Sequence, residues 1–160
     1  YRKLDATHTR ATDKQLSNHW HLAEIQSLLP EADVIWCRRD IRDVALSCFF
    51  QLFQFGAPWS SNLEHIVDYH HTYDRLMEHW ERVLDFKILR VDYEDLVVET
   101  PAQVERMLAH VGLDWDPKCL EFDTSKQITL TVSSEQVRQG IYRSSVGRWQ
   151  NYASYFSEIK

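Results

Sequence analysis

An arginine-rich turn between an apolar run and a helical pattern is the part of this chain best suited to bind an anion. It lies in Ile35–Phe50, IWCRRDIRDVALSCFF, with Arg39 at the turn and Ser47 about two helical turns further on. A guanidinium donates paired hydrogen bonds, and the first-turn N–H groups and the dipole of a helix favour negative charge. The segment is therefore a candidate phosphate site, although a solvated helix start has the same composition.

Two separated segments carry a resemblance to a known family. The first contains the pattern R-x-x-R-D-x-x-x-S over Arg39–Ser47, and the second, Ser133–Trp149, reads SSEQVRQGIYRSSVGRW. In order and in type they resemble the 3'-phosphate-binding and cofactor-covering segments of sulfotransferases that use 3'-phosphoadenylyl sulfate (PAPS). The sequence looks similar both to the tyrosylprotein sulfotransferases and to bacterial sulfotransferases that often follow tetratricopeptide repeats. The resemblance covers roughly residues 12–155.

The resemblance implies a set of site residues. The nucleotide of PAPS is expected to contact Arg39, Ser47, Tyr93, Ser134, Tyr142 and Arg148. Lys14 and Ser133 are expected to stabilise charge during transfer, because an ammonium and a hydroxyl aimed at the bridging oxygen bind the transition state more tightly than the ground state. The ordinary alternatives are an exposed lysine for Lys14 and a tyrosine packed at the sheet edge for Tyr93.

The chain departs from the family pattern at two places. Around Lys14 it reads T-D-K-Q-L-S-N, where bacterial relatives usually read T-D-K-M-P-x-N, which alters the local loop. Gly140 stands where the family typically has proline, so the cofactor cover is expected to be more mobile. Trp149 is expected to be a packing anchor rather than a ligand.

The pattern of elements predicts an α/β fold, a P-loop-type parallel sheet flanked by helices. Strands are expected at 34–37 and 86–91, and helices at 16–29, 40–55, 63–84 and from Thr100 to a stop at Gly112. Ser61 and Glu64 have the spacing of a capping box for the helix at 63–84. The carboxylates of Asp92, Glu94 and Asp95 are interpreted as turn and cap residues rather than as a catalytic pair. Residues 114–132 lack periodicity and are assigned mainly to loops.

The sequence predicts a single domain, residues 1–160, that is a partial sulfotransferase catalytic domain. The resembling enzymes hold the 5'-phosphosulfate with an N-terminal strand, loop and helix, and such a loop needs small residues so that its N–H groups reach the oxygens. None of the four glycines opens a unit of this kind. We therefore expect an N-terminally truncated fold, the C-terminal two-thirds of the catalytic domain, inactive alone. The upstream glutamate that is the general base in tyrosylprotein enzymes has no counterpart here.

Composition argues against several other classes of protein. A net charge of −6 and a pI near 5.7 disfavour a general nucleic-acid or membrane-surface binder. Cys37, Cys48 and Cys119 show no C-x-x-C spacing, and no histidine pair has the H-E-x-x-H spacing of a zinc site. The resemblance implies PAPS as co-substrate without a metal, because PAPS carries its own activated leaving group. The expected compartment is the cytoplasm, with a secretory lumen as the alternative.

The sequence leaves the acceptor open, and two functions other than sulfuryl transfer are considered. A hydroxyl on a peptide tyrosine, a glycan, a lipid or a small alcohol is compatible with the sequence. The long helix and an aromatic cluster indicate, as an alternative, a non-catalytic interaction module that self-associates; the cluster comprises Phe49, Phe50, Phe53, Phe55 and Trp59. A kinase-like enzyme needs the motif G-x-x-x-x-G-K-[ST], which is absent.

Overall fold

Two parallel strands form the centre of the fold, as the sequence predicts. The computed structural model describes residues 10–51, 53, 57–121 and 143–156. Strand β1 (Val34–Arg38) pairs with β2 (Ile88–Asp92), and the register runs from Val34 opposite Ile88 to Arg38 opposite Asp92. Because the strands are parallel, their carboxyl ends lie at the same edge of the sheet. The residues that follow Arg38 and Asp92 are therefore brought together.

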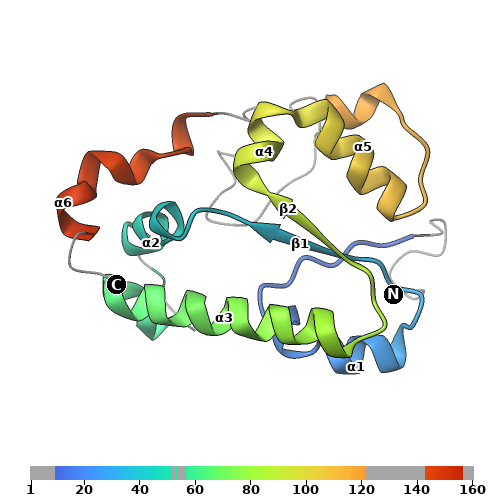
Figure 1. Ribbon diagram of the computed structural model, residues 1–160, viewed down its shortest axis with the longest axis horizontal. Coiled ribbons are helices and arrows are strands. Elements are labelled where there is room, and N and C mark those ends of the chain that lie inside the picture. Colours follow the sequence, from blue (N-terminus) through green and yellow to red (C-terminus); the bar gives the residue numbers. More distant parts are fainter. Residues whose placement is uncertain (1–9, 52, 54–56, 122–142, 157–160) are drawn as a thin grey trace.

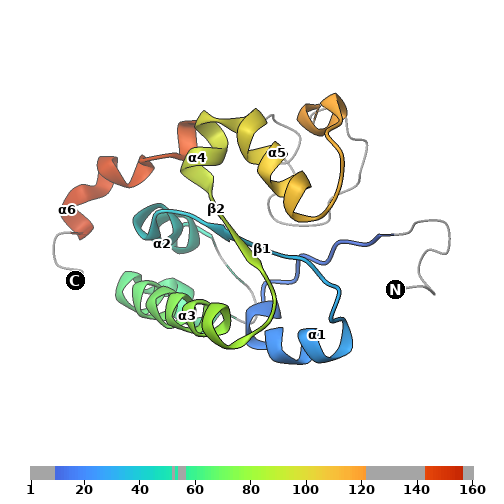
Figure 2. The ribbon, with the colours of Figure 1, turned by 45° about the vertical axis from the view of Figure 1, so that its right-hand side comes forward.

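Helices flank this sheet on both sides (Figures 1 and 2). Helices α1 (Leu22–Leu28) and α3 (Leu63–Val83) lie on one side, and α4 (Tyr93–Val98) and α5 (Thr100–His110) on the other. Helix α2 (Ile41–Phe49) follows β1, and the short α6 (Ala153–Phe156) lies near it. Short 3-10 turns complete the described elements: η1 (Asn18–Trp20), η2 (Pro58–Ser61), η3 (Pro117–Leu120), η5 (Arg143–Ser145) and η6 (Arg148–Tyr152).

The helix predicted at 16–29 is wrong in its first half, where the structure has η1 and then α1. The indole N–H of Trp80 donates to the carbonyl oxygen of His19 at 2.8 Å, and the His19 ring nitrogen Nδ1 lies 2.7 Å from the carbonyl oxygen of Leu16. In a continuous helix these carbonyls would accept from backbone N–H groups four residues later. Contacts made by side chains thus replace the first turns of the predicted helix.

Helix α2 ends at Phe49, earlier than the predicted bound of 55. The N–H of Gln51 donates to the carbonyl oxygen of Cys48 at 3.1 Å, which tightens the last turn. Residues 48–55, CFFQLFQF, continue a helical pattern with Gln51 and Gln54 on one side and contain no glycine or proline, so the sequence gives no stop signal before Gly56. The predicted boundary at 55 is therefore wrong, and residues 52 and 54–56 lie outside the described part.

The start of α3 differs from the predicted capping box. Asn62 is the N-cap, and its Oδ1 accepts from the N–H of His65 at 3.1 Å. The Ser61 hydroxyl instead donates to the carbonyl oxygen of Pro58 at 3.3 Å. An asparagine caps a helix as well as a serine does, so two neighbouring candidates compete and the sequence favours the wrong one. The helix itself matches the prediction for 63–84 to within one residue.

The other predicted elements are close to the observed ones, apart from α4. Gly112 follows α5 and has a φ of 64°, the left-handed conformation in which glycine commonly ends a helix. The sequence does not predict α4, which begins directly after β2. Its first turn carries Glu94 and Asp95, which favour a helix N-terminus, whereas Asp92 makes no side-chain cap. Among the described residues, no helix combines the length and apolar character needed to cross a membrane.

Two clusters of buried side chains pack several of these elements together. One joins Leu22 of α1, Trp36 of β1 and Met77 of α3. The second cluster, the α2–α3 cluster, joins α2, α3 and α6. Its buried members are Ala45, Leu46, Ile66, Val67 and Phe156. The α2–α3 cluster therefore fixes α2, which follows the anion-binding turn, in the fold.

Ile66 is 1% exposed within the α2–α3 cluster, so Ile66→Ala is expected to lower the free energy of unfolding by about 3 kcal/mol. The loss combines the removed apolar contacts with the cavity that remains. A urea titration measures it. Leu28→Ala is the control, because Leu28 is exposed, and it should change the free energy by less than about 0.5 kcal/mol. Equal effects of the two substitutions would contradict this core assignment.

Candidate active site at the carboxyl edge of the sheet

Arg39 and Tyr93 meet where the two strands end. Each is the first or second residue after its strand, and the guanidinium carbon of Arg39 lies 5.0 Å from the centre of the Tyr93 ring. A guanidinium over an aromatic face is attracted by the ring and held in one orientation. Tyr93 also takes part in a further contact of its side chain or backbone. The structure thus brings together two residues that the sequence places 54 positions apart.

Glu94 and Asp40 fix the turn that carries Arg39. The N–H of Asp40 donates to Glu94 Oε1 at 3.0 Å, which ties the end of β1 to the start of α4. Asp40 is also the N-cap of α2 and accepts from the N–H of Arg42 at 2.9 Å. Hydrogen bonds from the Arg42 side chain lower the pKa of the Asp40 carboxyl. The carboxylate that caps α2 is therefore charged at neutral pH.

The Arg39 guanidinium has a buried donor that no described residue pairs with. Its Nη2 donates to the carbonyl oxygen of Ser145 at 2.5 Å, across 106 residues. Its Nε is buried and has no hydrogen-bond partner among the described residues. A buried donor without an acceptor is unfavourable, and a phosphate oxygen is the kind of acceptor that a guanidinium fork accommodates. The geometry therefore fits an anion at this arginine.

Ser47 lies on α2, and Arg148 lies in η6, beside the end of that helix. Ser47 is exposed on α2, and Phe50 follows three residues later, on the same side of the helical path. The guanidinium carbon of the exposed Arg148 lies 5.5 Å from the centre of the Phe50 ring. Arg148 thus lies beside the C-terminal end of α2, at the residue three positions after Ser47.

Lys14 lies close to the carboxyl half of β1. Burial raises the pKa of the Cys37 thiol, and the charge of the nearby Lys14 partly offsets that rise, although Cys37 as a whole is exposed. Cys37 is two residues before Arg39. The lysine is itself exposed. The charge of Lys14 therefore acts on β1 at a residue close to Arg39.

Asp43 is a functional candidate that sequence reasoning missed. Its carboxylate is buried, and it accepts from the N–H groups of Gly147 and Trp149. The guanidinium carbon of Arg42 lies 3.6 Å from the centre of the Trp149 ring, which also packs edge-on against Phe156. Trp149 is a packing anchor, as predicted. Asp43 is the aspartate of the R-x-x-R-D-x-x-x-S pattern and lies in a helix first turn, but neither signal indicates that it binds the N–H groups of residues 147 and 149.

Three predicted ligands lie outside the described residues. These are Ser133, Ser134 and Tyr142, and the prediction of a mobile cover at Gly140 lies there as well. Their roles stay predictions. The neighbouring described turn η5 begins at the exposed Arg143, which adds a cation to the segment that Arg39 contacts.

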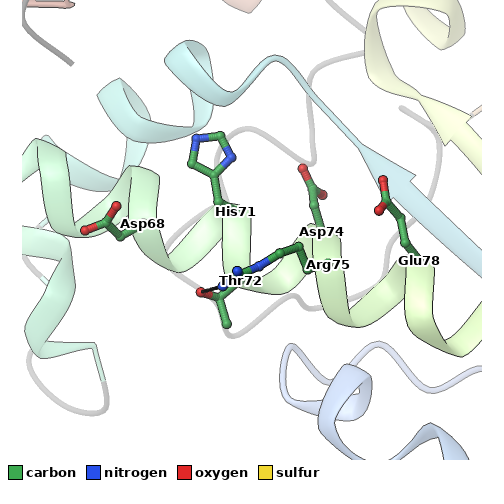
Figure 3. A pocket seen from close by; sticks show the side chains of 6 residues that line it. All are labelled: Asp68, His71, Thr72, Asp74, Arg75 and Glu78. Atoms are coloured by element: carbon green, nitrogen blue, oxygen red, sulfur yellow. Dashed lines mark hydrogen bonds between the residues drawn. The ribbon is translucent and has the colours of Figure 1, made fainter. Parts of the chain in front are cut away.

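Two pockets open near these residues. One, of about 500 Å³, is lined by Arg39 and by the turn around it, together with His70 and Asp74 of α3. The other, of about 620 Å³, lies along α3 (Figure 3) and is lined by Asp68, His71, Thr72, Asp74, Arg75 and Glu78. In the described part of the chain, no three histidine, cysteine or acidic side chains are grouped so that they could hold a metal ion.

Two half-buried histidines are expected to make folding depend on pH. Burial lowers the pKa of His70, although Asp74 Oδ2, at 3.2 Å from its Nδ1, acts to raise it; His71 and Arg38 add repulsion. Burial also lowers the pKa of His19, with a smaller repulsion from His21. Below about pH 6.5 the unfolded chain takes up protons that the folded histidines do not, so stability falls as the pH drops.

Thermal unfolding at pH 7.5 and 5.5 measures this dependence. As the pH falls, each histidine lowers the free energy of unfolding by at most about 1.4 kcal/mol per pH unit. His70→Gln removes one titrating group and should make the dependence shallower, with the contribution of His19 remaining. An unchanged slope in the variant would show that His70 does not contribute.

Comparison with known proteins shows the family of this chain. A model of the sulfotransferase family matches residues 1–117. An uncharacterized protein of Aquifex aeolicus is 32% identical over 98% of this chain, and cytosolic sulfotransferase 1 of Danio rerio is 26% identical over 74% of it. The chain spans 21% of the length of the first relative and 48% of the second. The family match covers the carboxyl edge of the sheet with Arg39, Ser47 and Tyr93, and the chain belongs to the sulfotransferase family.

Proposed function

We propose that the protein transfers a sulfuryl group from PAPS to a hydroxyl acceptor. The observation that carries the proposal is the Arg39 guanidinium at the carboxyl end of β1, with its buried Nε unpaired among the described residues and its plane near Tyr93. PAPS differs from most adenine nucleotides by its 3'-phosphate. A fixed arginine fork beside a helix N-terminus is the protein group that best discriminates such a phosphate.

The residues have separate roles in this proposal. Arg39 and Ser47 bind the 3'-phosphate, Tyr93 packs against the nucleotide, and Arg148 adds positive charge. The acceptor oxygen forms a bond to sulfur while the bond from sulfur to the bridging oxygen breaks, and the proton of the acceptor hydroxyl passes to a general base and from there to water. Negative charge then collects on the bridging oxygen of the departing bisphosphate. Lys14 stabilises that charge, as a fixed cation in a preorganised site does.

The experiment is a transfer assay with radiolabelled PAPS. The acceptors are a tyrosine peptide, a glycan, a lipid and a small alcohol, since each presents a hydroxyl and the family leaves the choice among them open. Labelled product together with 3'-phosphoadenosine 5'-phosphate supports the proposal and names the acceptor class. Because residues 1–160 alone are expected to be inactive, the assay uses the full-length protein. If that protein neither binds PAPS nor consumes it with any acceptor, the proposal is wrong.

A non-catalytic interaction module is the second candidate function. The observation in its favour is the exposure of Phe49, Phe50 and Phe53, at 44%, 48% and 40%, around the end of α2. Neighbouring exposed aromatic side chains mark many protein interfaces. This alternative predicts self-association in analytical ultracentrifugation, weakened by Phe49→Ser, and no response to 3'-phosphoadenosine 5'-phosphate.

A further inference from the structure

The buried carboxylate of Asp43 links two parts of the chain that are far apart in sequence. Asp43 is 2% exposed in the first turn of α2. Its Oδ2 accepts from the N–H of Gly147 at 2.7 Å and its Oδ1 from the N–H of Trp149 at 2.9 Å. Burying a carboxylate is unfavourable unless its oxygens are hydrogen-bonded, and here both oxygens are used. The position of residues 147–149 is therefore fixed by one side chain of α2.

The backbone of Gly147 is shaped for this contact. Its φ of 69° lies in the left-handed region, which glycine adopts without strain. The next turn, η6, begins at Arg148. The guanidinium carbon of Arg42 lies 3.6 Å from the centre of the Trp149 ring. Neighbouring residues of α2, Arg42 and Asp43, thus hold the ring and the backbone of the same short segment.

The segment held by Asp43 carries contacts of the nucleotide site. Ser145, two residues before Gly147, accepts from Arg39 Nη2. Arg148, between the two N–H groups bound by Asp43, lies over Phe50. A shift of residues 147–149 would move the Ser145 carbonyl away from Arg39 and Arg148 away from α2. The orientation of the Arg39 fork therefore depends on a carboxylate that is set one helical turn further along the chain.

We infer that Asp43 is a positioning residue for the 3'-phosphate site: its carboxylate holds residues 145–149 so that Arg39 and Arg148 lie ready for the phosphate. The inference rests on the proposed function. A purely structural role for Asp43 is the ordinary alternative, and it predicts lower stability without any change in the preference for a 3'-phosphate.

The test compares affinities for 3'-phosphoadenosine 5'-phosphate and 5'-AMP by calorimetry. Asp43→Asn keeps the shape of the side chain but leaves one of the two N–H groups without an acceptor. We expect it to weaken binding of the bisphosphate about 10- to 30-fold and binding of 5'-AMP less than about twofold. Gln103→Ala is the matched control. Gln103 is another buried polar side chain, on α5, and its Oε1 accepts from Arg106. The Gln103→Ala protein should prefer the bisphosphate over 5'-AMP as strongly as the wild type does.

Amide hydrogen exchange, followed by NMR, is the second readout. The N–H groups of Gly147 and Trp149 should be protected in the wild type and should exchange at least about tenfold faster in Asp43→Asn. Unchanged nucleotide preference in a folded Asp43→Asn protein would overturn the inference, even if its stability fell. If the wild type itself shows no preference, the proposed function fails and the link to the phosphate fails with it. Exchange at Gly147 and Trp149 then still decides whether Asp43 positions the segment.

Discussion

Arg39→Ala is expected to raise the Kd for 3'-phosphoadenosine 5'-phosphate about 30- to 100-fold while changing that for 5'-AMP less than about twofold. A charge-assisted bond from a guanidinium to a phosphate contributes about 2–3 kcal/mol, and every 1.4 kcal/mol is about tenfold in affinity. The bisphosphate alone carries the 3'-phosphate, so the loss is confined to it. Calorimetric titration of both nucleotides measures the two constants.

Two further variants sharpen this prediction. Arg39→Lys keeps the charge but loses the fork that reaches Ser145, so its affinity for the bisphosphate should lie between those of the wild type and of the alanine variant. Arg106→Ala removes an exposed arginine from α5, where it contacts Gln103, and should bind both nucleotides as the wild type does. Equal losses for both nucleotides in Arg39→Ala would mean that Arg39 supports the fold rather than the phosphate.

Lys14→Ala is expected to lower the rate of sulfuryl transfer about 10²- to 10³-fold while leaving the Kd of the bisphosphate within about threefold. Removing one preorganised group that stabilises developing charge has an effect of this size. Lys14 acts mainly in the transition state, so kcat and kcat/KM should fall together. The charge of Lys14 acts to lower the pKa of the Cys37 thiol, so Lys14 lies within electrostatic range of β1.

The matched control for Lys14 is Lys118→Ala. Lys118 is also an exposed lysine, but it lies in η3, after α5. Its loss should leave the transfer rate within about twofold. A Lys14→Ala protein that turns over as the wild type does would remove the lysine from the mechanism and return it to the ordinary role of an exposed side chain.

The periodicity of the chain predicts its main helices and strands because each of them buries a continuous stripe or run of apolar side chains. The run Val34–Arg38 and the stripe of α3 are of this kind, and both appear close to their predicted bounds. The break before α1 could not be predicted, since it depends on the indole of Trp80 reaching the carbonyl oxygen of His19 across 61 residues. Tertiary contacts of this sort override local helix propensity.

The candidate site likewise has one part that the sequence predicts and one part that it does not. Parallel strands bring their carboxyl ends together, so the meeting of Arg39 and Tyr93 follows from the predicted sheet. The role of Asp43 does not follow, because its partners Gly147 and Trp149 lie more than 100 residues away and are bound through backbone N–H groups that carry no sequence signal. Only the folded chain shows that pairing.

Titration of the wild-type protein with 3'-phosphoadenosine 5'-phosphate and, separately, with 5'-AMP tests the central claim most directly. The claim is that the carboxyl edge of β1 and β2 recognises a 3'-phosphate through Arg39. It predicts that the bisphosphate binds at least about tenfold more tightly than 5'-AMP, as one charge-assisted hydrogen bond suffices to produce. Equal affinities for the two nucleotides, or binding of neither, would contradict it.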